Sequence, residues 1–418
     1  MSSASRREFV TALGAAVLPD WPSSFPALRQ KVNGQPLVYL DSAATTLRPQ
    51  AVIDAVAGYY STDNANPSKA HSLAARAAER LHAARQNTAR FVNASHASEV
   101  IFVRGTTEGV NLVASSWGSA HLGSGDEIVL SVAEHSSNFM PWARAAERAG
   151  ANVRLADVDD DGRLSAEAVA AVLSTRTKLV AFSHVSNVLG YVNPAREITA
   201  MAKAAGAVVA IDGAQAAPHV RIDVRDLGCD FYIFSGHKML GPMATGVVWG
   251  RQELLDRMPP YHVGSNMAHD ATFERATFER GALKFQAGTP DVAGPVGLAA
   301  AIAFLERSGH DMVQKHDESL VRQGLERLRR IPRVRLIGPT GADRRLPVFT
   351  FTVAGLAPAA VASELDRRGI AVRAGDLAAL PLLKRFGVAE AVRASAYVYS
   401  TTRDFDRLAD ALDRITRA

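Results

Sequence analysis

A lysine follows an apolar segment in the middle of the chain, with a hydroxyl and an imidazole beside it. Residues 231–234 have the composition of a buried strand, and Ser235, His237 and Lys238 come directly after them, followed by a glycine-containing turn. An amine held in such a loop suits a Schiff base with the aldehyde of pyridoxal 5′-phosphate (PLP), with Ser235 and His237 binding the phosphate. We therefore predict that Lys238 is the catalytic centre. Taken alone, residues 235–238 also fit a strand-to-turn segment with a surface lysine, so the prediction depends on the rest of the chain.

A carboxylate and an amide follow an earlier apolar segment. Residues 208–211 are predicted as a strand that ends at Asp212, and Gln215 lies three positions further on. An aspartate placed against the pyridine nitrogen of PLP keeps that nitrogen protonated, which makes the ring an electron sink. Asp212 fits this role, and Gln215 is within reach of the phenolic oxygen. The competing interpretation of Asp212 is a helix N-cap.

Two further strand ends carry candidate ligands. A predicted strand at 99–103 is followed by a glycine, Thr106, Thr107 and a helical segment. Free backbone N–H groups and the dipole at a helix start favour a phosphate there, and this interpretation is compatible with a capping box. His135 follows a predicted strand at 127–132. An imidazole in that position can stack on the cofactor and move protons.

Taken together, these motifs resemble the fold-type I PLP enzymes of the class V aminotransferase superfamily. The closest resemblance is to the SUF-type (group II) cysteine desulfurases and selenocysteine lyases. It covers nearly the whole chain, through residues 25–28, 38–44, 104–111, 183–190, 212–215, 235–238 and 286–290. It implies an α/β subunit, with a large domain on a mainly parallel seven-stranded sheet and a smaller α+β C-terminal domain.

The resemblance also implies roles for the candidate residues. Lys238 matches the Schiff-base lysine, and His135 matches the histidine that stacks on the ring. Asp212 and Gln215 match the ligands of the pyridine nitrogen and the phenolic oxygen. Phosphate ligands are matched by Thr107, Ser235 and His237, and by Thr289 from the neighbouring subunit of an implied homodimer.

The substrate end of the site is matched by other residues. Asn187 and Arg393 correspond to residues that hold the substrate carboxylate, a task that suits a guanidinium fork. Arg373 is a further candidate for the same carboxylate. These matches predict an α-amino acid substrate, but no residue of the sequence identifies the side chain of that substrate.

The chain departs from the family at one position that matters for chemistry. The desulfurases carry a nucleophilic cysteine on a C-terminal loop, and here that position is Ala378. The single cysteine of the chain, Cys229, precedes the strand at 231–234 and is predicted to pack in the core. A methyl group cannot store a persulfide, so persulfide relay is not expected. Asp376, near the vacant position, is a candidate substrate-selecting group.

Three reactions remain open for such a site. Proton removal from the substrate Cα can lead to loss of a β-substituent, to transamination or to epimerisation. We favour cleavage of a C–S or C–Se bond by β-elimination, with an aminotransferase or epimerase of a specialised amino acid as the alternative. A non-catalytic PLP-binding partner protein is a third hypothesis, which the presence of Lys238 and Asp212 disfavours.

Composition supports an enzyme with a substantial core. The 418 residues are 47% hydrophobic, and one cysteine excludes a disulfide framework. The net charge of +5 is spread without basic blocks, so neither nucleic acid nor a membrane is an expected partner, and no metal site is predicted. No segment approaches the length of a membrane span.

The order of segments predicts the domain organisation. Further strands are expected at 178–182 and 246–249 in a large domain of residues 31–295. Helices at 296–308 and 312–330 and strands at 348–353 and 397–400 are expected in a small domain of residues 296–418. Between them the pentapeptide Ala-Thr-Phe-Glu-Arg occurs twice in succession, at 271–275 and 276–280.

The N-terminal segment, residues 1–30, allows two interpretations. Arg6 and Arg7 followed by a short apolar run resemble a twin-arginine export signal, which would place the protein in the periplasm. The run is short and Pro19 interrupts it, so we favour an N-terminal helix and a cytoplasmic protein.

Overall fold

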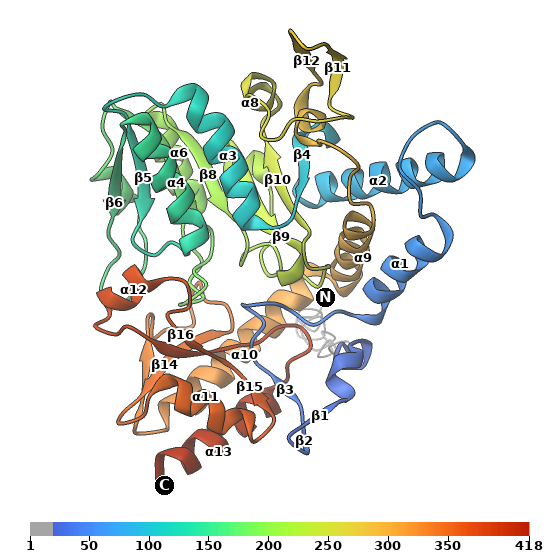
Figure 1. The fold of residues 1–418 in the computed structure, drawn as a ribbon. Helices are drawn as coiled ribbons and strands as arrows, with labels where there is room; N and C mark the ends of the chain where they lie inside the picture. Colours follow the sequence, from blue (N-terminus) through green and yellow to red (C-terminus); the bar gives the residue numbers. More distant parts are fainter. Residues whose placement is uncertain (1–19, 418) are drawn as a thin grey trace, which may run out of the picture.

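The computed structural model describes residues 20–417, and its centre is a seven-stranded sheet (Figure 1). The strand order is β4-β10-β9-β8-β7-β5-β6, and only β10 runs against its neighbours. The strands are β4 (Val100–Val103), β5 (Glu127–Ser131), β6 (Asn152–Ala156), β7 (Thr177–Ser183), β8 (Val208–Asp212), β9 (Phe231–Ser235) and β10 (Gly246–Gly250). The predicted mainly parallel α/β sheet of seven strands is confirmed.

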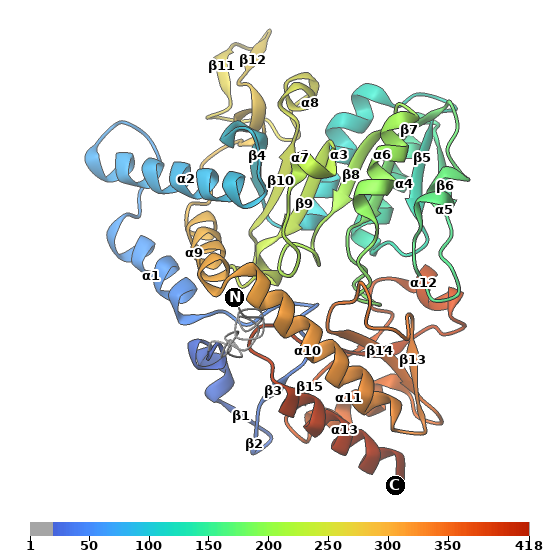
Figure 2. The ribbon, with the colours of Figure 1, turned by 180° about the vertical axis from the view of Figure 1, so that it is seen from behind.

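Helices cover both faces of this sheet, which explains why its central strands are apolar throughout. In β9, Phe231 and Ile233 pack on the same side as α3 (Thr106–His121) and α4 (Ser136–Ala149). Tyr232 and Phe234 point to the opposite core, which includes residues of α6 (Ala195–Ala204) and α7 (Val224–Leu227). Figure 2 shows α6 and α7 from the side opposite to Figure 1.

The first described residues lead into a helical layer beside the sheet. They form η1 (Pro22–Ser24), η2 (Pro26–Arg29) and the short antiparallel pair β1 (Lys31–Val32) and β2 (Gln35–Pro36). The helices α1 (Gln50–Thr62) and α2 (Ser72–Phe91) then each pack on α9 (Ala293–Ser308). α9 leads into α10 (His310–Arg329), which runs along the second sheet.

The second sheet is antiparallel, in the order β13-β14-β17-β16. Its strands are β13 (Val334–Ile337), β14 (Val348–Val353), β16 (Arg373–Gly375) and β17 (Ala391–Ser395), and its helices are α10, α11 (Pro358–Asp366) and α13 (Thr402–Arg417). Phe349, Phe351 and Phe405 are fully buried in its core. A parallel pair of β3 (Val38–Tyr39) and β15 (Ile370–Ala371) joins the N-terminal segment to this unit. The predicted smaller C-terminal domain is confirmed, while the boundaries at 31, 295 and 296 stay a prediction.

Several short helices and strands connect these larger elements. They are η3 (Ala97–Glu99), α5 (Ala166–Ala170), η4 (Gly236–Lys238), α8 (Gln252–Arg257), β11 (Ala268–Ala271), β12 (Ala276–Phe278), η5 (Gly281–Phe285) and α12 (Leu380–Arg385). Among the described residues, no helix combines the length and the apolarity that crossing a membrane requires. The two interpretations of Arg6 and Arg7 concern residues outside the described range.

One predicted strand is absent from the structure, and one strand of the large sheet was not predicted. The strand predicted at 397–400 is wrong, because the strand of this region is β17 and residues 397–400 form a turn in which the Ser400 N–H donates to the Tyr397 carbonyl at 2.8 Å. The strand-like composition of this segment reflects the burial of Tyr397, Val398 and Tyr399 between other elements, and not pairing in a sheet. The edge strand β6 was not predicted, since its mostly exposed residues lack an apolar pattern.

The duplicated pentapeptide forms a hairpin. Ala271 of the first copy pairs with Ala276 of the second, and the hairpin of β11 and β12 projects from the large sheet (Figure 1). Phe273 at its turn is fully exposed. The hairpin lies outside the cavity of its own chain that is described below.

Candidate active site

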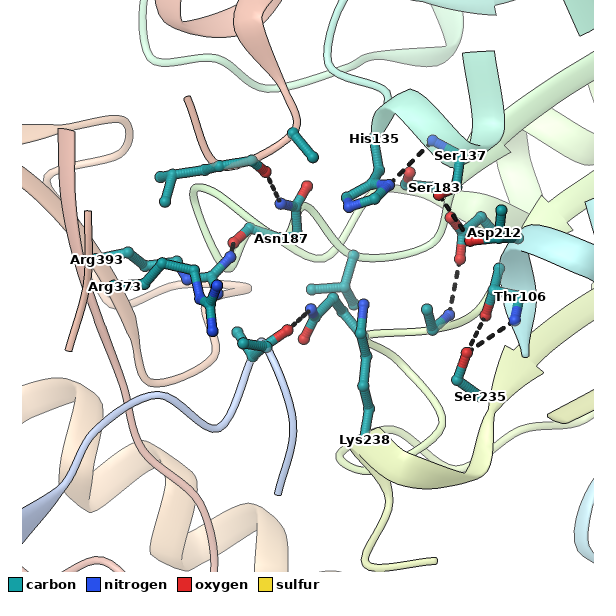
Figure 3. A pocket seen from close by; sticks show the side chains of 18 of the residues that line it. Thr106, His135, Ser137, Ser183, Asn187, Asp212, Ser235, Lys238, Arg373 and Arg393 are labelled. Carbon is teal, nitrogen blue, oxygen red and sulfur yellow. Dashed lines mark hydrogen bonds between the residues drawn. The ribbon is translucent and has the colours of Figure 1, made fainter. Parts of the chain in front are cut away.

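The carboxyl ends of the parallel strands meet at one edge of the large sheet, where the small domain covers them. A cavity of about 470 Å³ lies there (Figure 3). It is lined by every predicted site residue except one: Thr106, Thr107, His135, Asn187, Asp212, Gln215, Ser235, His237, Lys238, Arg373, Asp376 and Arg393. The exception is Thr289, which is exposed in the loop before α9. Its predicted role was in the neighbouring subunit's site, and this stays a prediction.

Lys238 lies on the connection between the antiparallel strands β9 and β10. The loop is fastened to residues near the N-terminus, because the His237 carbonyl accepts from the Thr46 N–H at 2.9 Å and the Leu240 N–H donates to the Thr46 hydroxyl at 2.9 Å. Burial lowers the pKa of Lys238 to about 8, with Asp212 opposing this effect and Arg393 adding to it. A larger fraction of the amine is therefore neutral, and hence nucleophilic, near neutral pH.

Asp212 ends β8 as a buried carboxylate close to Lys238. One of its oxygens accepts from the Ala214 N–H at 2.9 Å, and burial raises the pKa of Asp212. The residues that follow form turns rather than a helix, so the N-cap interpretation is wrong. Gly213 is required here because a Cβ would come within 2.1 Å of the Tyr232 ring. The Gln215 side-chain amide donates to the Ala43 carbonyl at 2.7 Å, which holds it at the cavity wall.

Hydroxyl groups cluster at the start of α3. The Thr106 N–H donates to the Ser235 hydroxyl at 2.8 Å, and the two hydroxyls lie 2.7 Å apart. The Thr107 hydroxyl donates to that of Ser137 at 2.8 Å. Helix N-terminal N–H groups and several hydroxyls at one place suit a phosphate. Sequence reasoning missed Ser137, although its position two residues after His135 at a helix start was a usable signal.

Two glycines allow close contact between the segment before α3 (the phosphate loop, residues 104–106) and the end of the connection that carries Lys238 (the lysine loop, residues 236–246). Gly105 precedes α3, and Gly246 begins β10. A Cβ on Gly246 would lie 2.5 Å from the Gly105 Cα, so no side chain fits at that position. The backbones of the two loops are therefore in direct contact.

His135 is held as a neutral imidazole. Its Nδ1 atom accepts from the Ser137 N–H at 3.1 Å, so the ring proton of the neutral form is on Nε2. Burial lowers the pKa of His135 to about 4, and Lys238 and Arg393 add to this effect. Burial likewise lowers the pKa of His237 to about 4. Both rings are thus neutral around pH 7.

Glu134 is a buried carboxylate behind the site that the sequence analysis did not single out. It accepts hydrogen bonds from Ser131, from Ser183 at 2.6 Å and from Asn138 at 2.7 Å. Burial raises the pKa of Glu134 to about 7 despite these donors. The network fixes the turn between β5 and α4 that presents His135. The only sequence feature that pointed to Glu134 was its position directly before His135.

Arg393 and Arg373 meet at a second missed carboxylate, Asp41. Arg373 makes a two-pronged salt bridge to Asp41, with Nη2 to Oδ2 at 2.7 Å and Nε to Oδ1 at 3.1 Å. The Nη2 atom of the buried Arg393 lies 3.6 Å from Asp41, and its Nη1 atom donates to the Asn187 carbonyl at 3.0 Å. The Arg393 Nε–H is buried without a partner among the described residues. This orphan donor suits a bound carboxylate. Asp41 follows the apolar residues 38–40, which was the available signal.

The loop that carries Ala378 is pinned to the cavity. The Asn187 side chain donates to the Leu377 carbonyl at 2.9 Å, and the Ser136 N–H donates to the Ala378 carbonyl at 2.8 Å. Leu377 and Ala378 both have a φ of 53°, in the left-handed region. Ala378 is among the residues that line the cavity. Cys229 is fully buried before β9, outside this lining, and burial raises the pKa of its thiol.

Comparison with known proteins agrees with this geometry. The family model for aminotransferase class V matches residues 38–408. The chain belongs to this family. It is 45% identical over 391 residues to a probable cysteine desulfurase of Halalkalibacterium halodurans, covering 93% of this chain and 96% of that one. It is 44% identical over 392 residues to a cysteine desulfurase of Synechococcus elongatus, covering 94% of this chain and 62% of the longer relative.

A solved structure shows the same fold. The apo cysteine desulfurase from Thermococcus onnurineus NA1 has a TM-score of 0.89 and 33% identity, over 94% of this class V chain and 98% of that one. The protein is thus a PLP-dependent, cysteine desulfurase-like enzyme. Its residues fit the cofactor: Lys238 for the aldehyde, the buried Asp212 for the ring nitrogen, and the hydroxyls at α3 for the phosphate.

Proposed function

We propose that the enzyme cleaves the Cβ–S (or Cβ–Se) bond of a cysteine-like amino acid by β-elimination, without storing sulfur on a protein thiol. The observation that carries the proposal is the pinned loop at Ala378. Ala378 lines the cavity at the position that, by resemblance, corresponds to the cysteine of the desulfurases, and Cys229 is buried elsewhere. Sulfur therefore has no protein acceptor and must leave in solution.

The bound PLP supplies an electron sink that stabilises negative charge on the substrate Cα. Arg393, with its orphan Nε–H, binds the substrate carboxylate, and Asn187 supports Arg393 through its carbonyl. Lys238 removes the Cα proton, because its lowered pKa makes it a base near neutral pH. The ammonium that Lys238 becomes can then return this proton to the leaving sulfur, while the neutral His135, with its proton on Nε2, donates a hydrogen bond to it.

The fold itself accommodates C–S lysis. The cystine C–S lyase C-DES has a TM-score of 0.80 to this chain at 23% identity, which establishes the shared fold. Because that fold also serves desulfurases, the reaction has to be decided by the residues in the cavity.

Product analysis tests the proposal. Holoenzyme is given L-cysteine, L-cystine and related thio-amino acids, and pyruvate, ammonia, alanine and released sulfur are measured, with Lys238→Ala as the control. We expect pyruvate and ammonia in equal amounts with the released sulfur. Alanine with sulfur released or bound to the protein would contradict elimination. A keto acid of the intact substrate, or its D-isomer, would instead establish the aminotransferase or epimerase alternative.

We also infer a homodimer in which Thr289 reaches the partner's phosphate site, and a cytoplasmic location. The exposed position of Thr289 outside its own cavity supports the first inference. Mixing a Thr289→Ala subunit with a Lys238→Ala subunit tests it, because only heterodimers contain one site with both residues intact. Recovery of activity on mixing is the expected result, and no recovery would contradict a shared site.

A further inference from the structure

Asp376 places a carboxylate at the outer wall of the cavity. It lies in the loop between β16 and α12, its side chain is exposed, and it lines the same cavity as Lys238. Among the described residues of this lining, the other carboxylate is Asp212, which is buried beside Lys238 and fits the cofactor. Asp376 is therefore the carboxylate that remains available to a substrate.

The orientation of Asp376 is fixed by its own loop. Its Oδ1 atom accepts from the Ala378 N–H at 3.0 Å, and its carbonyl accepts from the Ala379 N–H at 3.0 Å. Asn187 and Ser136 hold the same loop through Leu377 and Ala378, as described above. Within residues 20–417 the Asp376 carboxylate has this one hydrogen bond and no salt bridge. Its negative charge is thus unneutralised at a rigid position.

The charged side chains that line the cavity differ in exposure, since Asp376 is exposed and Arg393 is buried. The positive side chains Lys238 and Arg393 line the inner part, where Arg393 fits the α-carboxylate. Arg373 is already engaged by Asp41. Ala378, beside Asp376, leaves open the space that a cysteine side chain would fill. A substrate side chain that extends past Ala378 would therefore end near an unpaired carboxylate.

We infer that Asp376 is a specificity-determining residue, and that the preferred substrate is a cysteine conjugate whose sulfur substituent carries a positively charged amino group. The inference rests on the proposed β-elimination for its reaction, and on the position of Asp376 for its selectivity.

The implied reaction balances without an oxidant. The Cα proton is removed, the Cα–H electron pair forms a Cα–Cβ double bond, and the Cβ–S bond breaks with its pair on sulfur. The sulfur takes up a proton and leaves as a thiol, or as a persulfide when the substrate is a disulfide. Water then hydrolyses the remaining enamine to pyruvate and ammonia.

Binding of matched amino acids tests the selectivity separately from turnover. L-ornithine and L-norvaline have the same α-amino acid end and the same three side-chain carbons, and they differ by the distal ammonium. We expect the holoenzyme to bind L-ornithine about tenfold more tightly by isothermal titration calorimetry. Asp376→Asn retains an oxygen that can accept from Ala378 while removing the charge, so it should abolish the difference. Asp343→Asn, an exposed aspartate outside this cavity, is the matched control and should leave it intact.

Kinetics on S-(2-aminoethyl)-L-cysteine and S-propyl-L-cysteine provide the second readout. With Asp376→Asn we expect KM for the aminoethyl compound to rise about tenfold with kcat nearly unchanged, and KM for the propyl compound to stay constant. Equal binding of ornithine and norvaline by the wild type would overturn the role of Asp376, even if elimination is observed. Selective binding of ornithine without release of pyruvate would support the role of Asp376 and contradict the proposed elimination.

Discussion

The guanidinium of Arg373 and the carboxylate of Asp41 form a two-pronged salt bridge, with Nη2 to Oδ2 at 2.7 Å. Asp41 also lies 3.6 Å from the buried Arg393, so one carboxylate serves both arginines. It thereby keeps two cations together at the end of the cavity that faces the small domain. A substrate carboxylate that binds Arg393 would therefore lie next to Asp41, a carboxylate of the protein itself.

Asp41→Asn should therefore destabilise the protein. Arg393 is 3% exposed and would lose its only nearby carboxylate within residues 20–417. We expect the free energy of unfolding of the apoprotein to fall by about 2 kcal/mol in urea titrations. Asp343→Asn is the control, and an Asp41→Asn protein as stable as the control would show that the two arginines need no counter-charge.

Covalent attachment of PLP to the apoprotein should depend on pH through Lys238. The neutral amine is the reactive form, and it predominates above a pKa of about 8 instead of the ordinary 10.5. The second-order rate of attachment should therefore rise as pH increases and level off above about pH 8, as followed by absorbance in stopped-flow mixing. A rate that still increases tenfold per pH unit between pH 8.5 and 10 would show that burial does not lower this pKa.

Glu134 should make stability depend on pH in the opposite sense to an ordinary surface carboxylate. Its pKa is about 7 in the folded state against 4.5 unfolded, so between these values the folded protein binds more protons than the unfolded chain. Stability from this residue is present below pH 4.5 and is lost as pH rises toward 7. Glu134→Gln, which is always neutral, should remove this component, of the order of 2 kcal/mol, from unfolding curves between pH 5 and 7. Identical pH profiles for both proteins would contradict the raised pKa.

Ala378→Cys should create a sulfur acceptor at the cavity. After incubation with L-cysteine, intact-protein mass spectrometry should detect one added sulfur that dithiothreitol removes. Ala379→Cys is a close control because Ala379, the next residue of the same loop, is fully buried and does not line the cavity. Equal labelling of both variants, or of neither, would argue against a sulfur atom positioned over Ala378.

Much of the fold was predictable because its central strands are buried on both faces. Residues 231–234 and 208–211 are apolar at every position, and β9 and β8 were found within one residue of their ends. β6 was missed because it lies at an exposed edge. The residues at 397–400 were misassigned because burial in a turn gives the same composition as a strand.

The site was predictable where a polar residue follows such a strand. His135, Asp212 and Lys238 all do, and the parallel sheet brings their strand ends together. Asp41 and Ser137 were missed because their importance lies in contacts with residues distant in the fold or with a backbone N–H. Local sequence does not encode the partner of a salt bridge that spans 332 positions.

The contact between Gly105 and Gly246 has a mechanical consequence. Gly246 pairs with Val103, just before the phosphate loop, and with Ser235, just before Lys238. Because β10 is antiparallel to both β4 and β9, its first residue lies at the base of both loops. Neither loop can swing alone without parting this backbone contact, so the anchor for the phosphate and the anchor for the aldehyde move as one rigid clamp. The distance between them is thus set by the sheet.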